Sequence, residues 1–182
     1  KYLFNPFEVA FCGYSNSGKS TLICQLIEKL KANYSVGYVK HDAHRFEMDR
    51  EGKDTNKAWK SGSAQVFISD SNHSANLRRV QPNTFEMKNT LINNDLVLVE
   101  GYKNAEIEKI VIVDHDRKIL ENKDLTSVIA FVGQEDEIQG LPAPYFQRDQ
   151  VGEIYKFLLK NWLKKTPPLY GLVLTGGRST RM

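Results

Sequence analysis

The sequence has few cysteines and no long hydrophobic run, and each absence excludes a class of protein. Its 182 residues include only two cysteines, Cys12 and Cys24, which we expect to be small core residues of a reducing compartment rather than partners in a disulfide. The longest apolar runs, such as Val128–Val132, are far too short to cross a bilayer, and no signal peptide is recognisable. We therefore expect a soluble, cytoplasmic protein with no membrane contact.

An excess of charge of one sign is also missing. The net charge is only +3, and no basic cluster stands out beyond Lys164 and Lys165, so nothing supports binding to nucleic acid. No internal repeat or low-complexity tract is visible. A content of 41% hydrophobic and 26% charged residues is typical of a globular protein, and this length corresponds to one ordinary domain with a little to spare.

What the sequence does contain is a phosphate-binding loop. Residues 13–20 read Gly-Tyr-Ser-Asn-Ser-Gly-Lys-Ser, the GxxxxGKS pattern of P-loop proteins. An apolar run of strand length, Phe7–Cys12, precedes the motif, and a helical pattern with one apolar face follows it. That context predicts binding of a nucleoside triphosphate. The predicted nucleotide-binding residues are Gly13, Tyr14, Ser15, Asn16, Ser17, Gly18, Lys19, Ser20 and Thr21.

The spacing of this motif follows from the chemistry of a triphosphate. Glycines let the backbone fold so that successive N–H groups and the N-terminus of the following helix face the phosphates. Lys19 then reaches the β- and γ-phosphates, and the Ser20 hydroxyl can ligate the Mg²⁺ that bridges them. The sequence therefore predicts a nucleotide bound together with Mg²⁺.

Short apolar runs alternate with helical patterns along the rest of the chain. Such alternation predicts the α/β architecture of P-loop NTPases, a mostly parallel sheet with helices on both faces. Asp95–Val99 is almost continuously apolar, as a strand buried on both faces should be. Further strands are expected at Ser35–Lys40, Ala64–Ile68, Leu77–Val80, Ile110–Val113 and Val128–Val132, and helices are expected from Pro82 through Leu91 and from about Gln150 to Lys165.

The end of the chain departs from this pattern. Thr166-Pro167-Pro168 breaks the last helical stretch, and a fresh apolar strand, Leu169–Thr175, then opens onto a Gly-Gly-basic loop. We expect residues 1–165 to form the P-loop domain. Residues 166–182 are expected to be a linker and the truncated start of another domain.

An acidic candidate for the site lies at the end of a predicted strand. Leu96–Gly101 reads Leu-Val-Leu-Val-Glu-Gly, and a carboxylate at Glu100 would hold Mg²⁺ through water and orient an attacking water. Glu100 is therefore the expected catalytic residue. Asp95 is the alternative, but it begins the strand and would lie at the wrong edge of a parallel sheet. Lys103 follows closely enough to reach the same cleft.

The segment after the second strand carries further polar candidates. His41 and His44 follow that strand at the carboxyl edge of the sheet, and together they could bind a metal or an anion. Histidine pairs are common in solvated loops, and the residues alone favour that interpretation. Asp49 is a candidate carboxylate near Mg²⁺. Asp54 is expected to be the N-cap of a helix that runs through Trp59.

No motif identifies the base of the nucleotide. GTPases often carry Asn-Lys-x-Asp after a strand, and the aspartate accepts hydrogen bonds from guanine. Residues 121–124 read Glu-Asn-Lys-Asp, but the aspartate follows the lysine without a gap and the segment precedes a strand. We therefore reject this segment as a guanine motif.

Taken in order, the motifs resemble those of the molybdopterin-guanine dinucleotide biosynthesis protein B (MobB) family, GTP-binding P-loop proteins of molybdenum cofactor maturation. The family carries a P-loop, then Val-Lys-His-x-x-His, Asp-x-x-Gly-Lys-Asp-Ser/Thr, Ala-Gly-Ala and Val-Glu-Gly-Phe-Lys. The last four correspond here to Val39–His44, Asp49–Thr55, Ser61–Ala64 and Val99–Lys103. The departures, such as Tyr102 for phenylalanine, remove no charged or phosphate-binding group.

The resemblance implies a GTP-binding adaptor with weak GTPase activity, with GTP and Mg²⁺ as cofactors. It implies that His41 and His44 belong to the site, between the nucleotide and a partner surface. It also implies a homodimer, to which Ala64–Val80 could supply a hairpin. The implied partners are a guanylyltransferase similar to protein A of the same pathway (MobA) and, as a candidate ligand, molybdopterin. Residues 172–182 resemble the opening of MobA, so we expect that enzyme to be fused downstream.

Two other functions fit the same residues. A small-molecule kinase would use the P-loop, with His41, His44 and Lys103 gripping a phosphoryl acceptor. A nucleotide-gated metallochaperone would use the two histidines as ligands, although His-x-x-His without cysteine partners is a weak metal motif.

Overall fold

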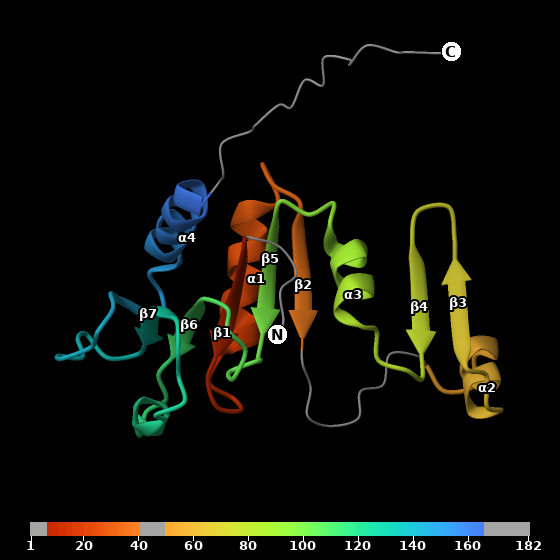
Figure 1. The fold of residues 1–182 in the computed structure, drawn as a ribbon, viewed down its shortest axis with the longest axis horizontal. Helices are drawn as coiled ribbons and strands as arrows, with labels where there is room; N and C mark the ends of the chain where they lie inside the picture. Colours follow the sequence, from red (N-terminus) through yellow and green to blue (C-terminus); the bar gives the residue numbers. More distant parts are fainter. Residues whose placement is uncertain (1–6, 41–49, 166–182) are drawn as a thin grey trace, which may run out of the picture.

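Six strands form the sheet that carries the P-loop (Figure 1). The structure is a computed structural model that describes residues 7–40 and 50–165. The strand order is β2-β5-β1-β6-β7-β8, and every neighbouring pair is parallel, which confirms the predicted α/β class. The strands are β1 (Glu8–Cys12), β2 (Val36–Lys40), β5 (Leu96–Glu100), β6 (Lys109–Ile112), β7 (Val128–Gly133) and β8 (Tyr145–Gln147).

Helices cover both faces of this sheet, as the alternating pattern predicts. Alternate residues of a strand point to opposite faces. Val9 and Phe11 of β1 therefore pack in one cluster with residues of α1 and α4, whereas Ala10 and Cys12 pack in another that includes Leu91 of α3. The helices are α1 (Lys19–Leu30), α2 (Asp54–Lys60), α3 (Thr84–Leu91) and α4 (Val151–Lys165), with a short 3₁₀ helix η1 (Lys118–Glu121).

The helix after the P-loop buries one stripe and leaves Cys24 outside it. Because an α-helix has about 3.6 residues per turn, position 24 falls away from the apolar stripe. Cys12 is buried, as predicted, but Cys24 is exposed, so its prediction as a core residue is wrong. The buried residues of the stripe are Leu22, Ile23, Leu26 and Leu30.

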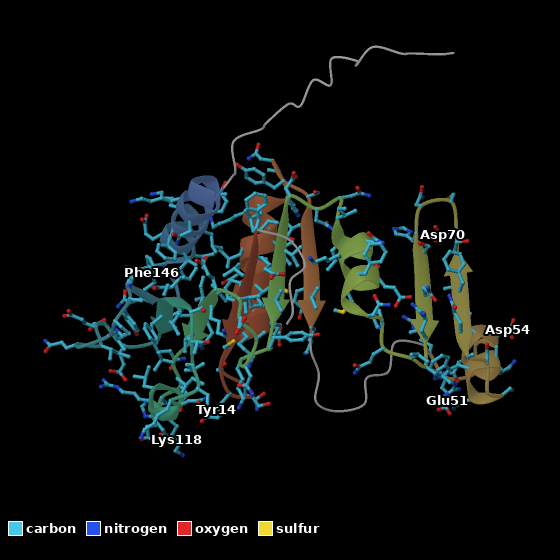
Figure 2. All side chains as sticks on the ribbon, viewed as in Figure 1. Tyr14, Glu51, Asp54, Asp70, Lys118 and Phe146 are labelled. Carbon is cyan, nitrogen blue, oxygen red and sulfur yellow. The ribbon has the colours of Figure 1, made fainter. Side chains whose placement is uncertain are left out.

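The two short predicted strands form a hairpin apart from the main sheet. β3 (Gln65–Ser69) and β4 (Ser74–Arg78) pair antiparallel with each other only. In Figure 1 the hairpin and α2 lie beyond α3, at the end of the molecule away from β6 and β7. Figure 2 likewise places Asp54 well away from Tyr14 of the P-loop.

The starts of two helices differ from the predicted ones. Asp54 is the first residue of α2 rather than its N-cap, which is Lys53 without a side-chain cap, so that prediction is wrong. In the first turn, the negative charge of the Asp54 carboxylate still stabilises the helix by interacting with the positive end of its dipole. Pro82 precedes α3, where Asn83 and Glu86 form a reciprocal capping box.

Several predictions fall outside the described residues. They concern His41, His44 and Asp49, and the linker and second-domain start at residues 166–182. Within the described ranges, no helix combines the length and the apolar character needed to span a membrane.

Candidate functional site

The loop between β1 and α1 has a backbone that requires both glycines of the motif. Gly18 has a φ of +84°, in the left-handed region that favours glycine. At Gly13, a Cβ would lie 2.7 Å from Ser17 Oγ, closer than real Cβ atoms come, and 3.0 Å from the Ile112 carbonyl oxygen, tighter than most such contacts. The loop thus folds back on itself directly before α1, as a phosphate cradle must.

The first turn of α1, which faces this loop, contains no acidic residue of its own. The N-cap of the helix, Gly18, has no side chain. The first N–H groups of a helix have no partner within it, and the helix dipole favours negative charge at this end. The arrangement suits a bound phosphate group.

The Lys19 ammonium lies over the same loop. Its Nζ donates to the Tyr14 carbonyl oxygen at 2.6 Å and lies 3.5 Å from Ser17 Oγ. Burial lowers the pKa of Lys19, and the Glu100 carboxylate opposes that shift. The loop's own oxygen atoms therefore hold this charge beside the cradle.

Glu100 brings a buried carboxylate to the start of α1. Ser20 Oγ donates to both of its oxygens, at 3.0 Å to Oε1 and 2.8 Å to Oε2. Lys40 Nζ lies 3.6 Å from Oε1. The contact arises because β5 is the parallel neighbour of β1, with Glu100 in register with Phe11, so that both strands end at the P-loop edge.

The donor atoms at this point fit a magnesium ion. A serine hydroxyl and a carboxylate are the hard oxygen donors that Mg²⁺ takes, usually with waters and phosphate oxygens completing its shell. Among the described residues, no group of three or more His, Cys, Asp or Glu could hold a metal by itself. Ser20 and Glu100 thus suit an ion that is held jointly with a nucleotide, whereas Asp49, the third predicted ligand, lies outside the described part.

Tyr38 is a member of the site that sequence reasoning missed. Its hydroxyl donates to Glu100 Oε2 at 2.8 Å. Burial and this hydrogen bond raise the pKa of Tyr38, so the phenol stays protonated and remains a donor. A signal exists in the sequence, because alternation along β2 places Tyr38 on the same face as Lys40, and Lys40 is in register with Glu100.

Arg148, just after β8, also reaches the P-loop. Its Nη2 donates to the Ser17 carbonyl oxygen at 2.6 Å, across 131 positions of sequence. A Cβ at Gly18 would meet its Nη1 at 2.9 Å, so the guanidinium lies against the loop. Nothing local in the sequence signals this contact, which depends on the strand order.

Lys103, predicted to reach the same cleft, is exposed in the loop after β5. Its charge acts on Cys12. Burial raises the pKa of the Cys12 thiol to about 11, although the positive charges of Lys109, Lys19 and Lys103 oppose this rise. Cys12 therefore stays a thiol, and its Sγ donates to the Gly101 carbonyl oxygen at 3.2 Å.

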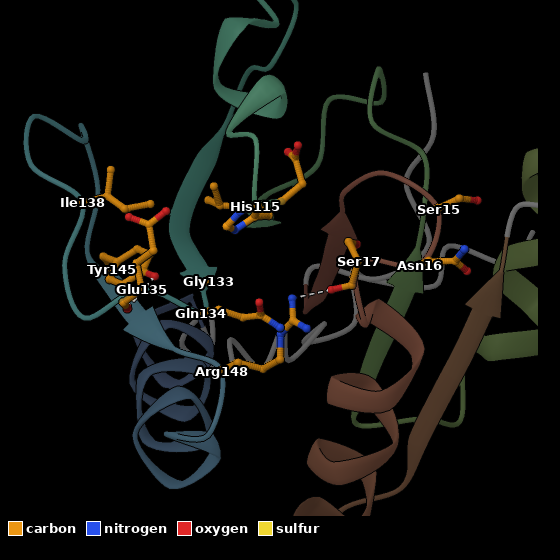
Figure 3. A pocket seen from close by; sticks show the side chains of 12 residues that line it. Ser15, Asn16, Ser17, His115, Gly133, Gln134, Glu135, Ile138, Tyr145 and Arg148 are labelled. Carbon is orange, nitrogen blue, oxygen red and sulfur yellow. Dashed lines mark hydrogen bonds between the residues drawn. The ribbon is translucent and has the colours of Figure 1, made fainter.

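A pocket lies beside the P-loop, on the flank where β6, β7 and β8 end. Ser15–Ser17 of the loop form one wall, and residues that follow the three strands, including Asp114, Glu135 and Arg148, form the others (Figure 3). Because β5 and β6 flank β1 on opposite sides, Glu100 and this pocket lie on different sides of the loop. The site therefore has a phosphate cradle with an acidic flank and a separate recess.

Comparison with known proteins agrees with this architecture. A family model described as MobB, molybdopterin guanine dinucleotide synthesis protein B, matches residues 8–134. The crystal structure of Bacillus subtilis MobB matches with a TM-score of 0.69 and 26% sequence identity, covering 85% of this chain and 96% of that one.

Two curated relatives are similar in sequence. The molybdopterin-guanine dinucleotide biosynthesis adapter protein of Haemophilus influenzae is 36% identical over 105 residues, which are 55% of this chain and 59% of the relative. The protein of the same name from Escherichia coli is 35% identical over 112 residues, 57% of this chain and 63% of the relative. The match spans less than two thirds of either relative's length.

Proposed function

The chain belongs to the molybdopterin guanine dinucleotide synthesis protein B family, and from that premise we propose that it is a GTP-binding adaptor with weak GTPase activity in molybdenum cofactor biosynthesis. The observation that carries the proposal is the hydrogen bonding of Ser20, the last residue of a complete P-loop motif, to the Glu100 carboxylate. Two relatives are named adapters of molybdopterin-guanine dinucleotide biosynthesis. The partner we propose is a guanylyltransferase similar to MobA, with molybdopterin as a candidate ligand of the complex.

In this proposal the residues of the P-loop divide the work on GTP. Backbone N–H groups of residues 13–18 and the start of α1 bind the phosphates, and Lys19 neutralises charge on the β- and γ-phosphates. Ser20 and Glu100 would hold Mg²⁺, which supplies charge neutralisation to the phosphates when bound. Tyr38 and Lys40 orient the Glu100 carboxylate through the contacts described above.

We expect slow turnover from the way Arg148 contacts the P-loop. An arginine that stabilises the transferring phosphoryl group is worth about 10³–10⁵ in rate. The Arg148 guanidinium is instead engaged with the Ser17 carbonyl oxygen. We therefore expect basal hydrolysis to be slow, as suits an adaptor rather than a dedicated hydrolase.

Binding measurements test this function. GTP should displace a fluorescent nucleotide at lower concentration than ATP when Mg²⁺ is present, and equal affinities would contradict the guanine preference. When the protein is incubated with either nucleotide and small-molecule acceptors, the γ-phosphoryl group should appear only as inorganic phosphate. Transfer of the phosphoryl group to any acceptor except water would favour a kinase and contradict the adaptor function.

We also propose that the protein acts as a homodimer in which a second copy covers the β3–β4 hairpin. A two-stranded hairpin alone is marginally stable in water, and only Val66 of this one is buried. Phe67 and Ile68 are 62% and 53% exposed, and Val80 beyond β4 is 70% exposed. Because consecutive residues of a strand point to opposite faces, Phe67 and Ile68 give each face of the hairpin an exposed apolar side chain that a second copy could cover.

Light scattering at micromolar concentration tests the dimer. We expect twice the monomer mass for the wild type and the monomer mass for a Phe67→Ser, Ile68→Asn double variant. A monomeric wild type would contradict the proposal. GTP binding by the variant serves as the check that the main sheet is folded.

A further inference from the structure

We propose that the Lys40 ammonium binds the terminal phosphate of the nucleotide, so that the site distinguishes a nucleoside triphosphate from a diphosphate. The inference rests on the proposed binding of GTP and assigns the residue that recognises its γ-phosphate. Lys40 is the last residue of β2, a strand that lies outside the P-loop motif.

Lys40 lies at the end of the cradle where the terminal phosphates belong. In a P-loop the lysine reaches the β- and γ-phosphates, and the serine after it holds the metal that bridges them. Lys19 and Ser20 therefore mark that end here. Glu100 accepts hydrogen bonds from Ser20 and is in register with Lys40. Figure 1 shows β2 and β5 side by side, with their carboxyl ends at the edge where β1 runs into the P-loop.

The contact of Lys40 with Glu100 leaves the ammonium group able to bind a phosphate. Its Nζ lies 3.6 Å from Glu100 Oε1, which makes an ion pair but is too long for a hydrogen bond. The carboxylate instead accepts hydrogen bonds from the hydroxyl groups of Ser20 and Tyr38. An ammonium group has three N–H donors, and the Lys40 side chain is 48% exposed. A ligand in the cradle therefore has access to these donors.

The charges around Lys40 also favour an anion. Lys19 and Lys40 both interact with the buried Glu100 carboxylate. Burial lowers the pKa of Lys19, and the positive charge of Lys40 adds to that lowering, so the two ammonium groups repel each other. One carboxylate does not balance two ammonium groups and a divalent ion. A terminal phosphate that contacts both lysines supplies the missing negative charge.

The position of Lys40 gives it a different role from that of Lys19. The Tyr14 carbonyl oxygen holds Lys19 over the loop at 2.6 Å, where it serves both the β- and the γ-phosphate. Adjacent strands lie about 4.8 Å apart, so Lys40, two strand spacings from β1, begins about 10 Å from the strand that leads into the loop. Its side chain approaches from the flank, beside Glu100. We therefore expect Lys19 to support binding of GTP and GDP, and Lys40 to support binding of GTP alone.

The experiment compares Lys40→Met with a matched control, Lys31→Met. Methionine keeps a long unbranched side chain and removes the charge. Lys31 also faces a carboxylate, that of Glu28, but it caps the far end of α1, a helix of 12 residues that is about 18 Å long at about 1.5 Å per residue. Affinities are measured with Mg²⁺ for GDP and for the β,γ-imido analogue of GTP, which resists hydrolysis.

We expect Lys40→Met to weaken binding of the GTP analogue about tenfold, because it removes a charge-assisted contact. GDP affinity should stay unchanged, which also shows that the variant is folded. Lys31→Met should change neither affinity, and Lys19→Ala should weaken both. Unchanged affinity for the analogue in Lys40→Met, equal losses for the analogue and GDP, or the same loss in Lys31→Met would overturn the proposal.

A double-mutant cycle separates direct binding from an effect through Glu100. If Lys40 contacts the phosphate, Lys40→Met should lower the affinity for the GTP analogue by a similar factor in the wild type and in Glu100→Gln. Loss of that effect in the Glu100→Gln background would show that Lys40 only positions the carboxylate, and would overturn the proposal. Failure of the wild type to bind either nucleotide would instead refute the proposed function.

Discussion

Replacement of Lys19 with alanine is expected to lower the affinity for GTP at least tenfold. The change deletes a charge-assisted contact with the phosphates that is worth about 1.5–3 kcal/mol, and about 1.4 kcal/mol corresponds to a tenfold change in affinity. The neutral variant also removes one of two donors to the Tyr14 carbonyl oxygen, which keeps the Ser17 backbone N–H at 3.2 Å. Isothermal titration with GTP in the presence of Mg²⁺ measures the effect.

Lys29→Ala is the matched control for this measurement. Lys29 is exposed in the last turn of the same helix, and ten residues at a rise of about 1.5 Å each place it about 15 Å from Lys19. Both variants lose one positive charge and the same side chain, so a general effect of charge would appear in both. Unchanged GTP binding by Lys19→Ala would mean that this loop is not the nucleotide site.

The sheet was largely predictable because buried parallel strands leave a local signal. All five residues of β1 and of β5 are buried, and both strands read as nearly continuous apolar runs. The start of β6 left no such signal. Lys109 begins this strand fully buried, with its ammonium donating to the carbonyl oxygens of Ala105, Ile107 and Thr126. These acceptors come from two loops that only the fold brings together.

The hairpin shows a different limit of sequence patterns. Short apolar runs predicted both strands, although Leu77–Val80 overlaps β4 only at Leu77 and Arg78. Such runs do not state which sheet a strand joins. β3 pairs with β4 alone, and the hairpin lies beyond α3 from the main sheet, an arrangement that no local pattern encodes (Figure 1).

The residues of the site also fall into two groups, those that a local motif predicts and those that only the fold brings to the P-loop. The P-loop is one contiguous segment, and Glu100 was predicted because the acid that ends a parallel strand lies at the ligand edge. Tyr38 and Arg148 reach the site across 62 and 131 positions. Their roles follow from the strand order, with β2 beside β5 and β8 beyond β7, rather than from any motif.

Replacement of Glu100 with glutamine is expected to impair Mg²⁺-dependent GTP turnover more than GTP binding. Glutamine keeps the size of the side chain and can still accept a hydrogen bond from Ser20 or Tyr38, so the P-loop edge should stay folded. It loses the negative charge that would hold a metal-bound water and that faces Lys40 in the structure. We expect turnover to fall about 100-fold, the low end for loss of a positioned base. Phosphate release under saturating GTP measures this, with GTP affinity determined separately.

Asp95→Asn is the control that separates this role from a general effect of acid removal. Asp95 immediately precedes the same strand, at its opposite end, where Oδ2 accepts from the Ser35 backbone N–H at 2.8 Å. Its amide variant should retain normal turnover per folded protein, because that edge of the sheet is remote from the phosphate cradle. If Glu100→Gln instead abolished GTP binding while the remaining bound fraction turned over normally, the carboxylate would serve only to hold Ser20 and Tyr38 in place. A selective loss of turnover in Glu100→Gln alone would assign the carboxylate to the metal and the attacking water.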